Sequence, residues 1–396
     1  MLANRILEIQ AALVEAELDG WFFAVFQSND PISSDLLGLA NKALVTRRCY
    51  YVVPSHGEPR KLVSTLEPAM LDHLPGTKAV YTTWQQHRQQ LELLVRDCGR
   101  LAAQYSPRNE IPTVSRLDAG TAELLTSFGC ALRTSADLAQ RFAAVWNQEQ
   151  LEGHRRANVH LHRIAREAFA LVSAHLGAER TIDERRVQQF ILEAFEQAGL
   201  HTEAPPIVGV NEHSADPHFE PAAEGSSPIR RGDFLLIDLW AKEKKSAESV
   251  YADITWCGVC ADAPTDRQEE IWRIARDARD AGIQLVQERW PSTPIHGFEV
   301  DDATREVIRV AGYGDAFYHR TGHSIGIKDH GQGANMDNLE THDTRRLIAM
   351  TGFSIEPGIY LAGEFGVRTE VNIALTPTTA EVTGGAAQHD LLRLLP

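Results

Sequence analysis

Four acidic residues interrupt apolar, strand-like runs of this sequence. Asp238 lies in FLLIDLWA, Asp253 in YADITW, Glu356 in FSIEPGIY and Glu370 in VRTEVNIAL. An ionised carboxylate in a buried strand loses its hydration, so it must be paired, protonated or bound to a cation. One such residue would indicate no more than a salt bridge. Four of them predict a shared cation site.

A fifth candidate ligand lies in HRTGHSIGIKDH, which holds His319, His323 and His330. Histidines four residues apart can be two ligands on one helical turn, but Gly322 and Gly326 flank the central one and SIGI has β character. We therefore expect a strand that enters a loop, with His319 and His323 on one face of the strand. One of these two can then bind a metal while the other lies nearby.

These five side chains form an oxygen-rich donor set that suits manganese, cobalt or zinc ions. Bridging carboxylates can hold two ions about 3.5 to 4 Å apart, and a metal-bound water ionises near neutral pH. The ions also polarise a carbonyl group. The chemistry indicated is hydrolysis of an amide or a similar bond without a covalent intermediate.

The acidic residues follow two sets of helical segments that resemble each other. HRIAREAFALV (162–172) and WRIARDARDAGIQLV (272–286) share RIAR, and TIDERRVQQFILEAFEQAGL (181–200) has a counterpart in FEVDDATREVIRVAGYG (298–314). Each set continues into strand-like runs. One short match could arise by chance, but two in the same order favour a duplicated α-β half. Duplication would place a functional site on the symmetry axis that the two halves share.

Local signals predict other elements. Thr181 and Glu184 are spaced as a capping box at the start of a helix that Gly199 ends. Near the N-terminus, Ile6 to Leu18 has helical periodicity, and the apolar runs WFFAVF and RCYYVVP predict strands. The turn PSHGEP before RKLVS predicts a hairpin. Strands that alternate with helices favour an α/β domain ending near Trp146.

Composition excludes several classes of protein. The chain has 396 residues, which favours two domains, and its formal net charge of −15 argues against nonspecific nucleic-acid binding. No apolar run approaches the ~18 residues of a membrane span. The start, MLANRILEIQAALVEAEL, is typical of an amphipathic helix and not of a signal peptide.

The five cysteines are interpreted as reduced thiols. In CGVC, Cys257 and Cys260 are interpreted as buried structural thiols in preference to a redox or zinc pair. We expect a cytoplasmic protein.

The five candidate ligands, in their order and local context, resemble those of the pita-bread metallopeptidases, the family of methionine aminopeptidase, aminopeptidase P and prolidase. IEPGIY and VRTEV are similar to the two glutamate motifs of that family, and RTGHSIG is similar to its histidine motif. The resemblance implies an α/β (α+β) fold class. Residues 1–147 would form a small creatinase/prolidase-like α/β domain, and residues 148–396 a catalytic pita-bread domain of two pseudo-symmetric α-β halves.

The resemblance implies a role for each matching residue. Asp238 would be a terminal ligand of one ion, His323 and Glu356 would complete the other, and Asp253 and Glu370 would bridge the two. Glu356 would also accept the proton of the attacking water.

Further residues match positions around the substrate. His330, seven residues after His323, and His218, in NEHSADPHFEP, match histidines that contact the substrate. Arg368 matches an arginine that braces the site, by contacting the substrate or by neutralising carboxylates. His319 is expected to line the pocket, whereas His213 is expected at the surface.

The implied activity is hydrolysis of the Xaa-Pro bond, most simply in dipeptides, with manganese as the first choice of metal and cobalt or zinc as alternatives. Arg345 and Arg346 are candidates to bind the free carboxylate of a dipeptide, or they form a solvated pair. Aminopeptidase P activity on longer peptides with proline in second position is the alternative. A metal-free creatinase-like hydrolase or a noncatalytic binding module would be expected to have lost ligands. The resemblance also implies a homodimer.

The sequence departs from the family pattern near the substrate. KEKKSAES (242–249) lengthens the connection between the first two acidic strands and is expected to form an exposed hairpin. ADITW lacks the arginine that often follows this aspartate motif in the family. DHGQGANMDN stands where many family members have an acidic residue and a proline-containing loop. The expected ligands are all retained.

Overall fold

The computed structural model describes residues 5–39 and 45–395. The chain forms two compact units, Met1–Ala143 and Ala144–Pro396, whereas the sequence suggested a boundary after residue 147. No helix in these described residues is long and apolar enough to cross a membrane.

The first unit is a six-stranded mixed sheet, in the order β4-β3-β2-β1-β5-β6, with helices on both faces. Its strands are β1 (Gly20–Val25), β2 (Cys49–Pro54), β3 (Arg60–Ser64), β4 (Thr77–Tyr81), β5 (Arg100–Ala103) and β6 (Ala131–Thr134). Its helices are α1 (Ile6–Glu15), α2 (Pro31–Leu36), α3 (Trp84–Val95), α4 (Ala119–Ser127) and α5 (Ala136–Ala143). The predicted hairpin is the antiparallel pair β2–β3. The predicted N-terminal helix is α1, and the first four residues of MLANRILEIQ lie outside the described residues.

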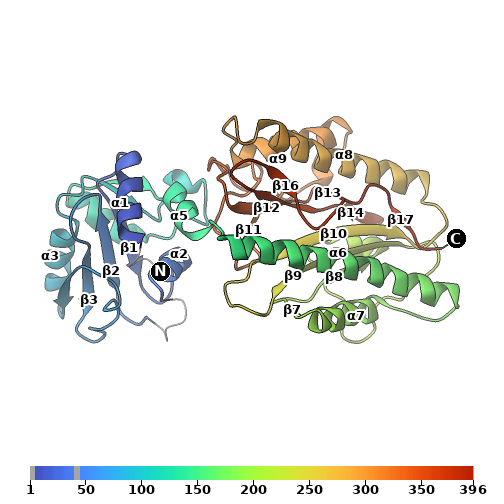
Figure 1. Cartoon of the computed structure of the whole chain (residues 1–396), viewed down its shortest axis with the longest axis horizontal. Helices are drawn as coiled ribbons and strands as arrows, with labels where there is room; N and C mark the ends of the chain where they lie inside the picture. Colours follow the sequence, from blue (N-terminus) through green and yellow to red (C-terminus); the bar gives the residue numbers. More distant parts are fainter. Residues whose placement is uncertain (1–4, 40–44, 396) are drawn as a thin grey trace. The chain divides into compact units, whose positions relative to one another are not determined.

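The second unit repeats one order of elements, two helices followed by strands that pair mostly antiparallel. The first set is α6 (Gln148–Gly177), α7 (Glu184–Gln197), β7 (Leu200–His201), β8 (Ile207–Val210), β9 (Phe234–Glu243) and β10 (Ala252–Val259). The second set is α8 (Asp266–Arg289), α9 (Gly297–Val310), β11 (Ser324–Ile325), β12 (Thr351–Ile355), β13 (Gly358–Leu361), β14 (Phe365–Arg368), β15 (Val371–Leu375), β16 (Ala380–Val382) and β17 (Leu392–Arg393). Figure 1 shows α8 and α9, in orange, side by side on one side of these strands, with α7, in green, on the other. The two RIAR segments lie in α6 and α8, the first helix of each set.

The side chains of β9 and β10 alternate between a face that packs in the apolar core and a face that carries polar groups. Leu235, Ile237 and Leu239 of β9 pack in one apolar cluster with Ile254 of β10 and with the buried faces of α6 and α7. Side chains alternate across a strand, so Asp238 must point to the opposite face. The long helix α6 therefore fixes which face of these strands carries the carboxylates.

The start of α7 differs from the sequence prediction. The helix begins at Glu184, and its N-cap is Asp183, whose carboxylate accepts from the amide of Arg186. Glu184 is fully buried and accepts from the amide of Val210 and from His213. The predicted capping box of Thr181 and Glu184 is therefore wrong, because Asp183 caps the helix from the adjacent position and Glu184 is engaged elsewhere. Gly199 follows the helix with a positive φ of 69°, as a helix stop requires.

The second set of strands is broken at the predicted ligands. GFSIEPGIYL divides into β12 and β13 at Glu356, and GVRTEVNIAL divides into β14 and β15 just before and at Glu370. Each glutamate thus lies in the break between two short strands. Such a break lets the side chain leave the alternation of the sheet.

The polar insertion 242–249 is only partly the exposed hairpin that was expected. Residues 244–248 are exposed, but Lys242 is buried and donates to the carbonyl of Ile327 at 2.5 Å. Cys257 and Cys260 are both buried free thiols, as interpreted from the sequence.

Candidate metal centre

A hydroxyl group links carboxylates from both sets of strands. Thr255 of β10 pairs in register with Asp238 of β9, and Asp253 lies two residues before it on the same face. The Thr255 Oγ1 atom lies 2.8 Å from Asp238 Oδ1 and 2.9 Å from Glu370 Oε2, and it accepts from Arg368 Nε at 3.0 Å. Since a hydroxyl carries one hydrogen, the two carboxylates share it.

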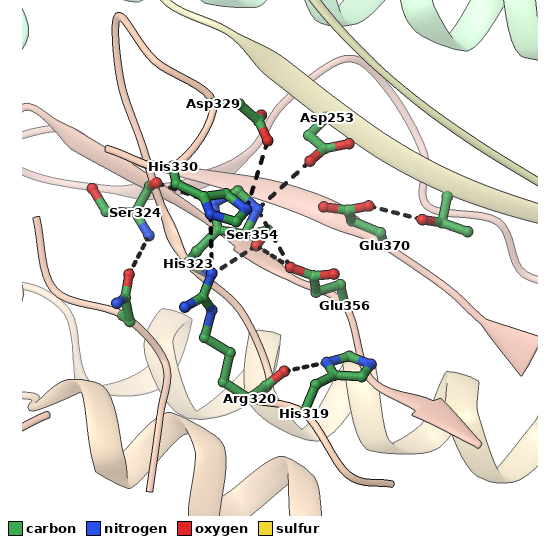
Figure 2. Close-up of polar contacts among 12 residues, drawn as sticks. Asp253, His319, Arg320, His323, Ser324, Asp329, His330, Ser354, Glu356 and Glu370 are labelled. Carbon is green, nitrogen blue, oxygen red and sulfur yellow. Dashed lines mark hydrogen bonds and ion pairs between the residues drawn. The ribbon is translucent and has the colours of Figure 1, made fainter. Parts of the chain in front are cut away.

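His323 lies between carboxylates of both sets. Its Nε2 atom is 3.4 Å from Glu356 Oε1 and 3.6 Å from Asp253 Oδ2. The Ser354 hydroxyl accepts from the His323 amide and donates to Glu356 Oε1 at 3.0 Å, which fixes both groups. Figure 2 shows Asp253 and Glu356 pointing toward the imidazole. Asp253, His323 and Glu370 each offer a ligand atom, all within 4.8 Å of one another.

The described residues satisfy the buried carboxylates of the cluster only in part. Asp253 Oδ1 and Glu370 Oε1 are buried without a hydrogen-bond partner in the described part of the chain. Burial raises the pKa of both carboxyls well above its usual range, and neighbouring carboxylates raise the pKa further. A divalent cation would satisfy these oxygens and remove the repulsion. The donor set therefore fits a metal site.

Arg368 is the cation closest to the carboxylate of Asp238. Its guanidinium forms a buried ion pair with Asp238 Oδ2 and contacts the Tyr360 hydroxyl at 3.3 Å. Burial raises the pKa of Asp238, and Arg368 acts in the opposite direction. Arg368 is thus placed to brace the site and to neutralise a carboxylate.

His319 lies beside the cluster with both ring nitrogens engaged. Its Nδ1 atom lies 2.6 Å from the Arg320 carbonyl, so it must donate there, and the Tyr360 hydroxyl lies 2.8 Å from Nε2. Burial lowers the pKa of His319 to about 4, so the ring is neutral at pH 7. Neither His319 nor His323 lies in a strand, since β11 begins only at Ser324, so the expectation that the two share one strand face is wrong.

His330 and His218 lie at the open side of the centre. The His330 ring packs 4.2 Å from the His323 ring, between centroids, and its side chain is 67% exposed. The charge of His323, burial and Arg320 lower the pKa of His330 to about 3, and His218 adds a smaller contribution. His218 is exposed, and the carbonyl of the preceding Pro217 accepts from the site arginine at 3.4 Å. His330 therefore lies against the candidate ligand His323, and His218 follows a residue whose backbone contacts Arg368.

Among the described residues, the side-chain contacts of the candidate Arg345 lie outside this cluster. Arg345 is buried, pairs with both carboxylate oxygens of Asp343 at 2.9 and 2.5 Å, and donates to the Gln332 carbonyl. Arg346 is exposed and forms a backbone bridge with His296. The commitment of Arg345 to Asp343 argues against a role in binding substrate.

Sequence reasoning missed Asp329. With His323 and His330 it forms a second group whose ligand atoms lie within 4.8 Å of one another, and its Oδ1 atom has no partner among the described residues. Burial raises the pKa of Asp329 to about 6. The signal in the sequence was an acid next to a predicted substrate histidine.

His213, expected at the surface, has a side chain that is 29% exposed but is paired with a buried carboxylate. Its Nδ1 atom lies 2.8 Å from Glu184 Oε1, and its ring stacks on Phe219 at 4.2 Å between centroids. The sequence gives no local sign of this pair, because the partners come from α7 and from the segment after β8.

Comparison with known families identifies this arrangement. Residues 154–377, more than half of the chain, match Peptidase_M24, which is described as metallopeptidase family M24. The match includes all five expected ligands. The chain belongs to metallopeptidase family M24. The expected α/β fold class is confirmed, and the second unit of this M24 protein matches the pita-bread fold of prolidase structures.

Several relatives share this family. An uncharacterized peptidase of Schizosaccharomyces pombe is 27% identical over 388 residues, which is 93% of this chain and 78% of that protein. A Xaa-Pro dipeptidase of Lactobacillus helveticus is 32% identical over 173 residues, 43% of this chain and 42% of that protein. Alignments with uncharacterized peptidases of Staphylococcus aureus likewise span about half of those relatives, 54% in one case.

Solved structures share the fold of the M24 chain. Dipeptidase PepE from Mycobacterium ulcerans superposes with a TM-score of 0.71 at 22% identity, covering 100% of this chain and 98% of that chain. Other similar structures are prolidases and X-Pro aminopeptidases.

Proposed function

We propose that this M24 metallopeptidase hydrolyses the Xaa-Pro bond of dipeptides. The observation that carries the proposal is the set of buried carboxylate oxygens without partners around His323. Such oxygens are stable when they ligate cations, and the five side chains at the family positions form a complete donor set. The Xaa-Pro dipeptidase relative supports the choice of substrate.

Five residues would hold two divalent ions, with manganese favoured over cobalt and zinc. They are Asp238, Asp253, His323, Glu356 and Glu370. When bound, the ions supply an activated water and polarise the scissile carbonyl.

Glu356 is the proposed proton acceptor. Burial raises the pKa of Glu356, but His323, His319 and Arg368 together outweigh burial and hold the pKa below its usual range. Glu356 is therefore ionised at neutral pH and can accept a proton from water and pass it to the leaving amine. The Ser354 hydroxyl holds Glu356 Oε1 in place.

The exposed His330 and His218 are proposed to contact the substrate. His330 packs on the ring of a metal ligand, so a donor on its imidazole lies close to the reacting carbonyl. An imidazole at this position can hydrogen-bond the oxygen on which charge develops.

Aminopeptidase P activity on longer peptides is the second candidate, because X-Pro aminopeptidases are among the structures that share the fold. A homodimer stays a prediction from the family resemblance.

Metal binding and substrate length test the proposal together. Metal-free protein is titrated with Mn²⁺ by calorimetry and then assayed with Ala-Pro and with Ala-Pro-Ala. We expect binding, and faster cleavage of Ala-Pro. Asp253→Asn should abolish both, whereas Asp390→Asn, at an exposed position, should change neither.

Absence of bound Mn²⁺ together with absence of turnover would refute the metallopeptidase proposal. Faster cleavage of Ala-Pro-Ala would instead favour the aminopeptidase.

A further inference from the structure

Lys242 is a buried lysine on the face of β9 that carries the candidate ligand Asp238. Side chains four residues apart on a strand point to the same face, so Lys242 lies about 13 Å further along that face than Asp238. Its side chain belongs to a residue that is only 8% exposed. Lys244 and Lys245, the next lysines of the polar insertion 242–249, are instead exposed and pair with carboxylates.

The Lys242 ammonium contacts a carbonyl and an aromatic ring. Its Nζ atom donates to the Ile327 carbonyl at 2.5 Å and lies over the Tyr251 ring, 4.9 Å from the centroid. Within residues 5–39 and 45–395, no carboxylate forms a recorded ion pair with it. Burial lowers the pKa of Lys242, because a buried cation loses its hydration. Burying this cation without a countercharge costs free energy, which makes its contact with Ile327 a candidate for a functional role.

The carbonyl that accepts from Lys242 lies in residues 326–331, the His330 loop, which follows β11. Backbone bonds hold both ends of the loop, since the Tyr251 amide donates to the Gly326 carbonyl at 2.9 Å and the Gly331 amide donates to the Ser324 carbonyl at 2.6 Å. Residues 327 and 328, between these ends, are exposed. In the described part of the chain, the recorded bond from another segment to the backbone of 327–330 is that of Lys242.

We propose that Lys242 is a positioning residue that holds the His330 loop over the candidate metal centre and so places His330 for catalysis. The inference rests on the proposed function, in which His330 contacts the substrate. The His330 side chain is 67% exposed and packs 4.2 Å from the His323 ring between centroids, so its position depends strongly on the backbone of its loop. The Ile327 carbonyl lies three residues before His330, and fixing it limits the movement of the ring.

The polar insertion thereby has a role in the site. Its outer residues 244–248 are exposed, whereas its first residue, Lys242, turns inward to the His330 loop. The Gln150 side chain of α6 donates to the Glu248 carbonyl at 2.9 Å, which holds the far end of the insertion. Because the sequence departs from the family pattern in this segment, the family resemblance does not imply the contact.

The test compares Lys242→Met with Lys244→Met on the Mn²⁺-loaded full chain. Methionine keeps an unbranched apolar side chain and removes the donor. Lys242→Met should lower kcat for Ala-Pro about tenfold and leave KM within about threefold, because His330 is proposed to bind the oxygen on which charge develops. Lys242→Arg keeps a donor and should recover part of the loss. The control Lys244→Met, at an exposed position of the same insertion, should match the wild type.

Two further measurements separate positioning from a general loss of structure. The recorded side-chain contacts of Lys242 go to Ile327 and Tyr251, so Lys242→Met should bind Mn²⁺ within about threefold of the wild type, whereas a disturbed β9 would displace Asp238 and weaken binding about tenfold or more. In a His330→Ala background, Lys242→Met should have little further effect on kcat, because it acts through His330.

Equal effects of Lys242→Met in the two backgrounds, or a loss of Mn²⁺ affinity parallel to the loss of kcat, would overturn the inference and leave the dipeptidase function standing. If the wild type does not cleave Ala-Pro, the proposed function fails, and hydrogen exchange decides the inference separately. Amides of residues 326–331 should then exchange about tenfold faster in Lys242→Met than in the wild type or Lys244→Met. Exchange of this loop at the wild-type rate would refute the role of Lys242.

Discussion

At the scale of residues, Thr255 links the two sets of strands that build the centre. Its hydroxyl contacts Asp238 from the first set and both Glu370 and Arg368 from the second. The side chain is fully buried, so no water competes for these contacts. Thr255 is therefore a positioning residue for at least two of the expected ligands, although it binds no metal itself.

Thr255→Val should weaken Mn²⁺ binding by about tenfold to a hundredfold, because groups that orient metal ligands typically contribute that much. Valine keeps the shape of threonine and removes only the hydroxyl. Thr255→Ser keeps the hydroxyl and should bind within about threefold of the wild type. Calorimetric titration of the metal-free proteins measures both. Equal affinities of the valine and serine variants would contradict the role.

At the scale of elements, the segment of His323 is held against β12 at a distance that only glycine permits. A Cβ atom on Gly322 would lie 1.9 Å from the Ser354 carbonyl oxygen. Backbone bonds join Ser354 to the His323 carbonyl at 2.9 Å and Gly322 to Met336 at 3.3 Å. The glycine therefore lets the histidine segment approach the strand that precedes Glu356.

Gly322→Ala should push β11 away from β12 and displace His323, at a cost of about 1 to 3 kcal/mol in the free energy of unfolding, as overpacking typically does. Mn²⁺ affinity should fall at the same time. Gly326→Ala is the matched control, because its Cβ would meet its nearest neighbour, Gly331, at 3.3 Å. Denaturation and metal titration of both variants test this. A Gly322→Ala protein as stable as Gly326→Ala would contradict the explanation.

At the scale of the molecule, every residue of the candidate centre belongs to Ala144–Pro396. The first unit has its own apolar clusters on both faces of its sheet, and no group from Met1–Ala143 is needed to complete the donor set. Metal binding should therefore stabilise the second unit directly.

Mn²⁺ at about 100 times its dissociation constant should stabilise the second unit by about 2.7 kcal/mol, which slows exchange through global unfolding about a hundredfold. Hydrogen exchange measured by mass spectrometry should show this protection in β9 and β10, and little change in β1 and β2. Asp253→Asn should remove the effect. Equal protection in the first unit would contradict the assignment of metal binding to Ala144–Pro396 alone.

The sequence by itself determined the fold class, the two sets of helices and the hairpin of the first unit, since periodicity and turn residues are local signals. It also indicated the candidate ligands, because an acid inside an apolar strand is visible without a structure. The tertiary structure decided which side chains contact one another. The links from Thr255 to two carboxylates and the burial of Arg345 against Asp343 were not visible in the sequence. A contact between segments far apart in the chain depends on how the strands pair, and local patterns do not specify that pairing.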